Sequence, residues 1–257
     1  MTRVAIITVP YIRAAHHAIL AYRTMTSLAQ LDLGEHTIDK IAVSNAFDPI
    51  VDEIDVFKDF FDCWIDSDKN VLARSWNRGV EVAFERGNEY ALVINLDLAF
   101  HPRFLINIIQ AAKTYPEAIL WSGGLWPEEA TLVSEPLSDL TVNRGAHYSC
   151  FMVDQRLFKQ VGKFDENLKP AYHEDSDMIY RIELANLQQY TVQDARFFHY
   201  DRATLIGLHI ENRTDELNAI RKSMDESMDY YFCKWGGLPG KEIFKIPFNF
   251  IKIYKTN

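Results

Sequence analysis

Carboxylate, amide and imidazole side chains lie beside apolar runs at three places in this 257-residue chain. A carboxylate can take a proton as a general base, and hard divalent cations prefer oxygen ligands. Groups of this kind at three sites, each next to a segment that reads as buried, favour a shared reaction or binding site over scattered surface polarity. The residues concerned are Asn95, Asp97, Glu174, Asp175, Asp177 and His199.

The four carboxylates among these residues also have ordinary structural explanations. Asp97 follows an apolar run that ends at Ile94, and Asx residues often lie in turns. Carboxylates at the start of a helix are favoured by its dipole, so the acids within 174–177 could be capping groups. Asp177 and Arg181 are four residues apart and could simply pair on a helix surface. Three acids within four residues are nevertheless more than a helix start needs.

Strands and helices in alternation must position these groups. The expected strands are residues 4–9, 38–43, a short part of 60–70 and 90–95, and the expected helices are about 14–31, 70–87 and 102–116. This order predicts an α/β fold with a mostly parallel central sheet and helices on both faces. In such sheets ligands bind beyond the carboxyl ends of the strands, which is where Asn95 and Asp97 are expected.

The second half continues the pattern. An apolar-periodic helix follows the acids within 174–177, and the strand 191–200 ends with His199, again a polar group at a strand terminus. Residues 214–237 predict a longer helix in a C-terminal extension that spans 201–257.

Four segments together resemble family 2 glycosyltransferases, which have the GT-A fold. TVPY after the first strand resembles the family's nucleotide-binding turn. NVLARSWNRG resembles its Asn-x-Gly…Asn-x-Gly segment, although Leu72 replaces the first glycine. LVINLD resembles a strand that ends in a variant Asp-x-Asp motif, with Asn95 in the first position. FMVDQRLFKQVGKFDE and HEDSDMIYRI match the family's apolar strand, short helix, Gly-x-Phe-Asp-Glu turn and Glu-Asp-x-Asp helix start, in order.

The resemblance implies an inverting glycosyltransferase that moves a sugar from a nucleotide-sugar donor to a hydroxyl of a glycan or lipid-linked acceptor. The departing nucleoside diphosphate develops negative charge, which a divalent cation such as Mn²⁺ or Mg²⁺ would stabilise. The family pattern assigns Asp97 to this cation, with His199 as a second ligand. Asn95 carries no charge and is expected to bond the ribose or the donor sugar instead.

The same pattern assigns the general base to Asp175, with Glu174 and Asp177 orienting the acceptor, the base or Arg181. One base and one displacement invert the anomeric configuration without a covalent intermediate. The resemblance covers roughly residues 3–200, so residues 1–200 are expected to form the catalytic domain and 201–257 a helical extension packed on it. Base and ribose contacts are expected from Pro10, Tyr11, Asn45, Asp48, Asn70 and Arg74.

Composition limits the partners and the compartment. The net charge is −9 with no block of like charges, which argues against nucleic acid or an anionic membrane as the main partner. Three widely spaced cysteines suggest reduced thiols and a cytoplasmic protein, and the apolar N-terminus is too short to span a membrane. The aromatic and basic residues 241–257 are expected to pack on the core, with an oligomer contact or a peripheral membrane contact as alternatives.

Two other functions fit parts of the pattern. A nucleotidyltransferase would use a similar sheet and metal, but it should carry a glycine-rich, basic phosphate loop after the first strand, and TVPYIRAAHH has none. A non-catalytic nucleotide- or carbohydrate-binding module should have lost its acids, and all four carboxylates remain at Asp97, Glu174, Asp175 and Asp177.

Overall fold

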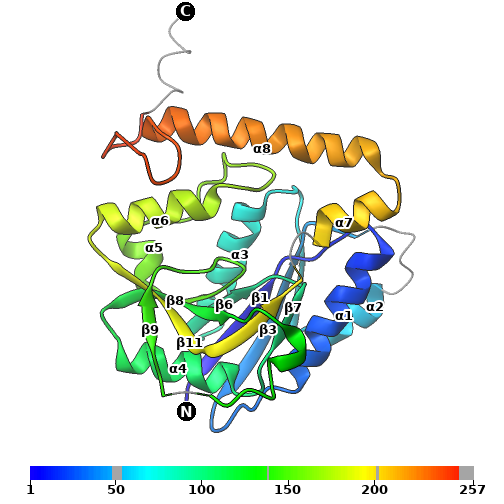
Figure 1. Cartoon of the computed structure of the whole chain (residues 1–257), viewed down its shortest axis with the longest axis vertical. Coiled ribbons are helices and arrows are strands. Elements are labelled where there is room, and N and C mark those ends of the chain that lie inside the picture. Colours follow the sequence, from blue (N-terminus) through cyan, green and yellow to red (C-terminus); the bar gives the residue numbers. More distant parts are fainter. Residues whose placement is uncertain (48–53, 138, 201–202, 249–257) are drawn as a thin grey trace, which may run out of the picture.

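The chain folds around one mixed β-sheet with helices on both faces (Figure 1). The computed structural model describes residues 1–47, 54–137, 139–200 and 203–248. Within these residues the main sheet consists of β1 (Arg3–Thr8), β3 (Thr37–Ser44), β5 (Cys63–Asp66), β6 (Tyr90–Ile94), β7 (Leu98–Phe100), β8 (Ala118–Leu125), β9 (Val142–Arg144), β10 (Cys150–Val153) and β11 (Gln188–His199). A separate pair is formed by β2 (Tyr11–Ile12) and β4 (Ala46–Phe47).

Most of the helices lie where the sequence predicts them, but the pattern does not predict the helices Ile54–Phe60 and Ala203–Ile210. The helices are α1 (Ala15–Ala29), α2 (Ile54–Phe60), α3 (Leu72–Glu85), α4 (Phe104–Thr114), α5 (Arg156–Gln160), α6 (Glu174–Leu184), α7 (Ala203–Ile210) and α8 (Thr214–Trp235), with a 3₁₀ turn at Glu129–Thr131. In the described ranges, none of these helices combines the length and the apolar character needed to cross a bilayer.

The strand order explains why the sheet is mostly parallel. The order is β5-β3-β1-β6-β10-β8-β11-β7, with β9 paired to β11. Strands β5, β3, β1 and β6 are parallel, and β8 and β11 run the same way because β10 lies antiparallel to both β6 and β8. Only β7, β9 and β10 oppose this direction within the described sheet. The predicted α/β fold is therefore confirmed.

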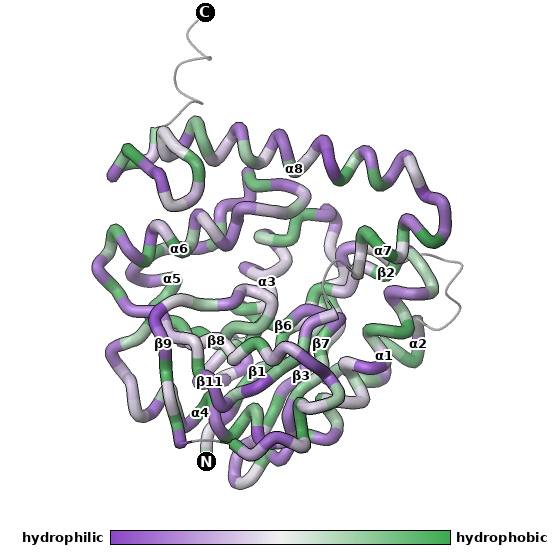
Figure 2. Tube along the Cα trace, in the orientation of Figure 1, coloured by the Kyte–Doolittle hydropathy of each residue, from purple (hydrophilic) through white to green (hydrophobic). Residues whose placement is uncertain are grey.

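Continuous apolar runs form the central strands because both of their faces are covered. In β1, Val4 and Ile6 pack against a core shared with α1 and α4, while Ala5 and Ile7 pack against a core shared with α3 and α6. Figure 2 shows hydrophobic residues concentrated along the central strands and mixed hydropathy along α8. Gly79 lets α3 approach closely, because a Cβ there would lie 2.4 Å from Ile7 Cγ2.

Asn77 of α3 fixes the turn that follows α5. Its amide donates to the Phe164 carbonyl at 2.9 Å and accepts from the Phe164 N–H at 2.9 Å, and it also donates to Glu166 at 3.1 Å. The second asparagine of NVLARSWNRG is thus a buried structural residue. It holds the Gly-x-Phe-Asp-Glu turn against α3 and so positions the segment that leads to α6.

The C-terminal helices α7 and α8 pack against α1 and α6, respectively. In α7, Gly207 allows close contact with α1, because a Cβ there would lie 2.4 Å from His17 Nε2. The long helix α8 runs over α6 (Figure 1), and its Tyr231 and Trp235 form a small core with Leu168. Residues from both helices reach the cavity described next.

Candidate active site

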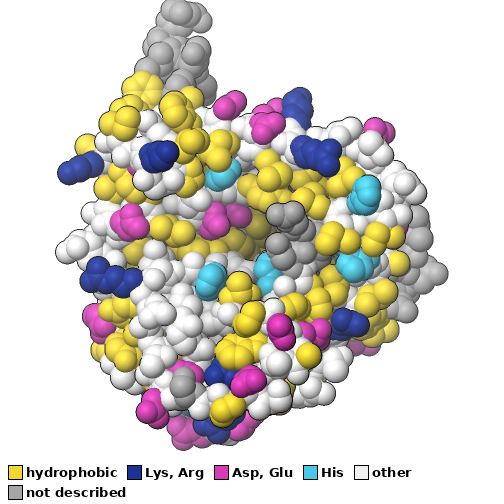
Figure 3. Space-filling view, in the orientation of Figure 1, with side chains coloured by type: hydrophobic (Ala, Val, Ile, Leu, Met, Phe, Trp, Pro, Cys, Tyr) yellow, Lys and Arg dark blue, Asp and Glu magenta, His cyan; other side chains and the backbone are white. Residues whose placement is uncertain are grey.

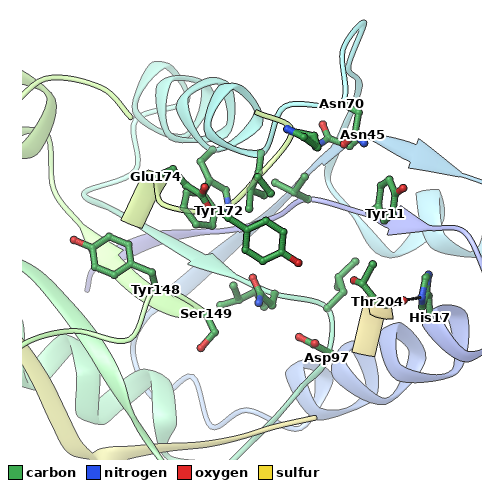
Figure 4. Close-up of a pocket in the computed structure, with 18 of the residues that line it drawn as sticks. Tyr11, His17, Asn45, Asn70, Asp97, Tyr148, Ser149, Tyr172, Glu174 and Thr204 are labelled. Atoms are coloured by element: carbon green, nitrogen blue, oxygen red, sulfur yellow. Dashed lines mark hydrogen bonds between the residues drawn. The ribbon is translucent and has the colours of Figure 1, made fainter. Parts of the chain in front are cut away.

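One cavity of about 570 Å³ lies beyond the carboxyl ends of β1, β3 and β6 (Figure 4). Figure 3 shows the molecule hollowed below α8, with acidic and histidine side chains near the hollow. The structure brings segments from both halves of the chain to this cavity. The predicted site residues that line it are Tyr11, Asn45, Asn70, Asn95, Asp97, Glu174, Asp175 and His199.

Three other predicted residues do not line the cavity, and Asp48 lies outside the described residues. Pro10 is buried, and its carbonyl accepts the Asn45 N–H at 2.9 Å, so it joins the loops after β1 and β3. Arg74 is turned away and pairs with Asp68 at 2.8 Å. Asp177 is fully buried.

Asp177 is a buried anchor for the C-terminal helix. Its carboxylate is fully buried, accepts from Arg181 Nε at 2.8 Å and Trp235 Nε1 at 2.8 Å, and pairs with Lys234 Nζ at 2.5 Å. The expected pairing with Arg181 is present, but it is not a surface contact because α8 covers it. Of the three predicted targets of Asp177, which are the acceptor, the base and Arg181, the structure shows the pairing with Arg181, and the three protein donors hold the carboxylate away from the cavity lining.

Asp97 and His199 meet because of the sheet pairing. Strand β7 lies antiparallel to β11 with Leu98 opposite His199, and the Tyr200 N–H donates to the Asp97 carbonyl at 2.9 Å. This register places His199 Nε2 3.3 Å from Asp97 Oδ1. Two residues far apart in sequence therefore form one carboxylate–imidazole pair at the cavity.

The pair suits a divalent cation that receives its other ligands from a bound molecule. Asp97 Oδ1 is buried and has no hydrogen-bond partner besides the contact with His199 Nε2, so it retains ligand capacity toward the cavity. A carboxylate and an imidazole both occur among ligands of Mn²⁺-type ions. In the part of the chain that the structure describes, no three His, Cys, Asp or Glu side chains converge as a complete metal site. A cation here would thus need phosphate or water oxygens as well.

Glu174 is a buried carboxyl group in the cavity wall. It is 5% exposed, and its Oε2 atom has no hydrogen-bond partner. Burial, followed by the negative charge of Asp175, raises the pKa of Glu174 to about 8. At neutral pH this group therefore holds its proton and can donate a hydrogen bond.

The backbone before Glu174 is strained. Tyr172 and His173 have φ angles of 81° and 69°, in the left-handed region that non-glycine residues seldom adopt. Such residues persist where surrounding contacts over-determine them, and they gather at functional sites. Here Ser227 of α8 donates to the carbonyls of Lys169 and Ala171 at 3.3 and 3.4 Å. The C-terminal helix thus supports the strained turn that presents the acids.

We expect Glu174→Gln to remove a pH dependence of stability. Because the folded-state pKa is raised, the stability that the neutral carboxyl contributes is fully present below about pH 4.5. This contribution is lost as the pH rises from 4.5 to about 8, because unfolding then releases a proton. The shift from 4.5 to about 8 corresponds to a full loss of about 5 kcal/mol. Urea unfolding at pH 5 and pH 8.5 measures it. The wild type should lose more stability than Glu174→Gln over this range, and equal losses would contradict the raised pKa.

Asp175 differs from Glu174 in its surroundings. Its side chain is only partly buried, and its Oδ1 atom accepts from the Ser176 N–H at 2.7 Å. It lines the cavity directly beside Glu174. Two adjacent carboxyl groups are therefore placed differently, one buried and protonated and one open to the cavity. Environments that separate carboxyl groups in this way commonly separate their acid and base roles.

Several cavity residues escape sequence reasoning. Tyr148 and Ser149 precede β10, which meets the end of β6, so the Asn95 N–H donates to the Ser149 carbonyl at 2.9 Å. Polar residues before an apolar strand can be assigned to the cavity only when the antiparallel pairing of that strand is known. Helices α7 and α8 contribute Thr204, Ile220 and Ser223, which no local motif marks. Asn45, in contrast, follows a strand as predicted, and it accepts a hydrogen bond from Ser75.

Comparisons with known proteins agree with this architecture. No protein-family profile matches the chain. A galactofuranosyl glycosyltransferase of Leishmania donovani is 36% identical over 64 residues, which cover 24% of this chain and 15% of that protein. The aligned part is short, so this relative bears on a single segment.

Solved structures align over most of the chain. S. aureus TarS 1–349 in complex with UDP aligns with a TM-score of 0.54 at 12% identity, covering 77% of this chain and 60% of that one. GalNAc-T7 with UDP, GalNAc and Mn²⁺ aligns with a TM-score of 0.59 at 10% identity, covering 77% of this chain and 44% of that one. This chain spans less than two thirds of either structure. The likeness to these structures extends over 77% of this chain and shows the GT-A fold that the sequence motifs predict.

Proposed function

We propose that this protein is an inverting glycosyltransferase that moves a sugar from a nucleoside-diphosphate donor to a hydroxyl group. The observation that carries the proposal is the single cavity in which the Asp97–His199 pair and the Glu174–Asp175 pair meet. Transfer needs charge stabilisation at the departing diphosphate and a base at the attacking hydroxyl. The two pairs can supply these separate needs within the same cavity.

Asp175 is the proposed general base. Glu174 is a weaker candidate, because a carboxyl group whose pKa is about 8 already holds its proton at neutral pH. Asp175 would accept the proton of the acceptor hydroxyl as its oxygen attacks the anomeric carbon. The bond from that carbon to the diphosphate oxygen breaks, and one displacement inverts the configuration. Glu174 would donate a hydrogen bond to a sugar and thereby help to orient it.

The donor would lie along the strand ends. Tyr11, Asn45 and Asn70 are proposed to hold the base and ribose, and Asn95 to bond the ribose or the donor sugar. A divalent cation, Mn²⁺ or Mg²⁺, would be held by Asp97 and His199, where it supplies positive charge to the diphosphate. The likeness to two structures that contain UDP makes uridine diphosphate the first nucleotide to test.

The acceptor would lie beneath the C-terminal helices. Tyr172, Ile220 and Ser223 line the same cavity as Glu174 and Asp175. An aromatic ring and an aliphatic side chain suit the apolar face of a sugar, and hydroxyl groups suit its edge. We therefore propose a glycan or lipid-linked saccharide as the acceptor.

The described cysteines are all free thiols, which suits a cytoplasmic enzyme.

A ligand screen by thermal unfolding tests the proposal. A ligand that binds only the folded state raises the melting temperature. We expect UDP with Mn²⁺ to stabilise the protein more than either alone, and UDP-sugars to be hydrolysed or transferred. If no nucleoside diphosphate or nucleotide sugar shifts the melting temperature with or without metal, the proposed function is wrong.

We expect Asp97→Asn to abolish the cooperation between metal and nucleotide. The amide keeps the shape of the side chain but carries no charge, so the site loses its anionic ligand for a hard cation. The measurement is the UDP dissociation constant with and without Mn²⁺ by titration calorimetry. The metal should tighten UDP binding at least tenfold in the wild type and less than twofold in the variant.

Asp229→Asn is the matched control, because that residue is an exposed acid on α8 and does not line the cavity. It should retain the full metal effect. An unchanged metal effect in Asp97→Asn would show that the cation, if one binds, is held elsewhere.

A further inference from the structure

A cluster of apolar side chains is exposed at the end of α8 and in the segment that follows it. Ile243 and Ile246 are 72% and 81% exposed. Sequence patterning predicts that the segment 241–257 packs on the core, but its described part, 241–248, presents its large apolar side chains to solvent. We call this cluster the C-terminal apolar surface, and its members are Phe232, Leu238, Ile243, Phe244, Ile246 and Phe248.

The segment is nevertheless held in place by its backbone. The N–H groups of Ile243 and Phe244 both donate to the Trp235 carbonyl, at 3.0 and 2.9 Å, and the Phe248 N–H donates to the Lys234 carbonyl at 2.9 Å. Tyr180 of α6 donates to the Phe244 carbonyl at 3.1 Å. The loop therefore fastens to α8 and α6 through its main chain, while Ile243 and Ile246 face solvent and the contacting rings of Phe244 and Phe248 are partly exposed. An exposed apolar cluster of this kind marks an interaction surface.

The segment that carries most of this surface is basic, although the exposed acids Glu183 of α6 and Asp229 of α8 lie near it. Lys241 and Lys245 are exposed among the apolar residues, and the one acid of the segment, Glu242, accepts hydrogen bonds from Tyr231 and from the Gly240 N–H. The sequence from 243 to 257 continues with lysines and apolar residues and contains no Asp or Glu. The net charge of −9 argues against attraction of the whole molecule to an anionic surface, but charges beyond about 10 Å are screened at ordinary salt, so this locally basic segment can act on its own.

We propose that the C-terminal apolar surface docks on an anionic phospholipid bilayer. Apolar side chains enter the interface, and each lysine near an anionic surface adds electrostatic attraction. A second copy of this chain is a poorer occupant, because a self-complementary contact would place the lysines of both copies together. The inference is independent of glycosyl transfer, although a bilayer contact would bring the cavity near a lipid-linked acceptor.

Vesicle flotation tests the proposal with the full chain. In 50 mM salt the wild type should float with vesicles of phosphatidylcholine containing 30% phosphatidylglycerol, at least fivefold more than with phosphatidylcholine alone, and 500 mM salt should release it. The variant Ile243→Asp/Ile246→Asp should bind at least tenfold less. The variant Lys241→Gln/Lys245→Gln, which keeps the apolar residues, should bind less at 50 mM salt and respond less to added salt.

A matched control carries the same added charge elsewhere. Val56→Asp/Val133→Asp replaces two exposed apolar residues away from the surface and should bind as the wild type does. Binding of UDP, or an unchanged melting temperature, verifies that each variant is folded. The proposal is overturned if the wild type does not float with anionic vesicles, or if Ile243→Asp/Ile246→Asp floats equally well. It is also overturned if sedimentation velocity shows a dimer that this variant dissociates while vesicle binding is absent.

Discussion

Asp175→Asn is expected to lower the rate of sugar transfer by about 10²–10⁴-fold, because that is the usual contribution of a positioned general base. The amide preserves the size of the side chain and can still accept from the Ser176 N–H, as the carboxylate does at 2.7 Å. It cannot take the proton of an attacking hydroxyl. Steady-state kinetics with the donor and acceptor identified by the ligand screen measure the effect.

The loss should fall on kcat and leave donor binding nearly unchanged. Asp175 belongs to the acceptor side of the cavity in our proposal, so the UDP dissociation constant should change less than twofold. Glu174→Gln is the informative companion variant, because its amide can also donate a hydrogen bond. It should retain far more activity than Asp175→Asn at pH 7. The base assignment fails if Asp175→Asn transfers sugar at the wild-type rate, or if Glu174→Gln is the more damaging of the two.

Local patterning predicts the first half of this fold well, for a physical reason. Val4 to Ile7 are apolar on both faces because helices cover both faces of β1, so burial is visible in the sequence itself. The polar residues that end such strands must then lie at one edge of the sheet. This rule places Asn45, Asn95 and Asp97 at the cavity from strand positions alone.

The C-terminal contribution could not be predicted in the same way. Asp177 reads as a helix-surface acid paired with Arg181, and nothing local shows that Lys234 and Trp235 bury it. That contact depends on where α8 crosses α6, which is a tertiary arrangement. Ile220 likewise reads as an ordinary apolar residue of a helix, although it lines the cavity. Residues supplied by a separate element leave no spacing signal near the motif that they complete.

The charges between α6 and α8 give the second large expected effect. Lys234 Nζ lies 2.7 Å from Asp165 Oδ2 and 2.5 Å from Asp177 Oδ1, and the three side chains are 11%, 14% and 0% exposed. Lys234→Met should keep the aliphatic packing but leave two buried carboxylates without their shared cation. Breaking such a buried pair costs about 3–5 kcal/mol. Urea unfolding at pH 7 measures the loss in the free energy of unfolding.

The matched control lies on the same helix. Lys222 pairs with Glu226 at 3.6 Å, but these side chains are 78% and 64% exposed. Because exposed pairs of this kind contribute about 0.5 kcal/mol or less, Lys222→Met should be nearly neutral. Equal effects of the two substitutions would show that Lys234 stabilises the fold only through the packing of its aliphatic side-chain carbons or through helix propensity, and not through its charge.

The pH dependence separates charge from packing. Burial alone would raise the pKa of Asp165, but the charge and hydrogen bond of Lys234, with hydrogen bonds from Asn167, lower it overall. Because the folded-state pKa is depressed, this stabilisation is present above the ordinary value of 3.8 and is lost as pH falls through the folded-state pKa. The difference between the wild type and Lys234→Met should therefore be largest at pH 7 and shrink below about pH 4. A difference that stays constant down to pH 3 would assign the effect to packing, and α8 would then be held on α6 by Tyr231 and Trp235 rather than by buried charge.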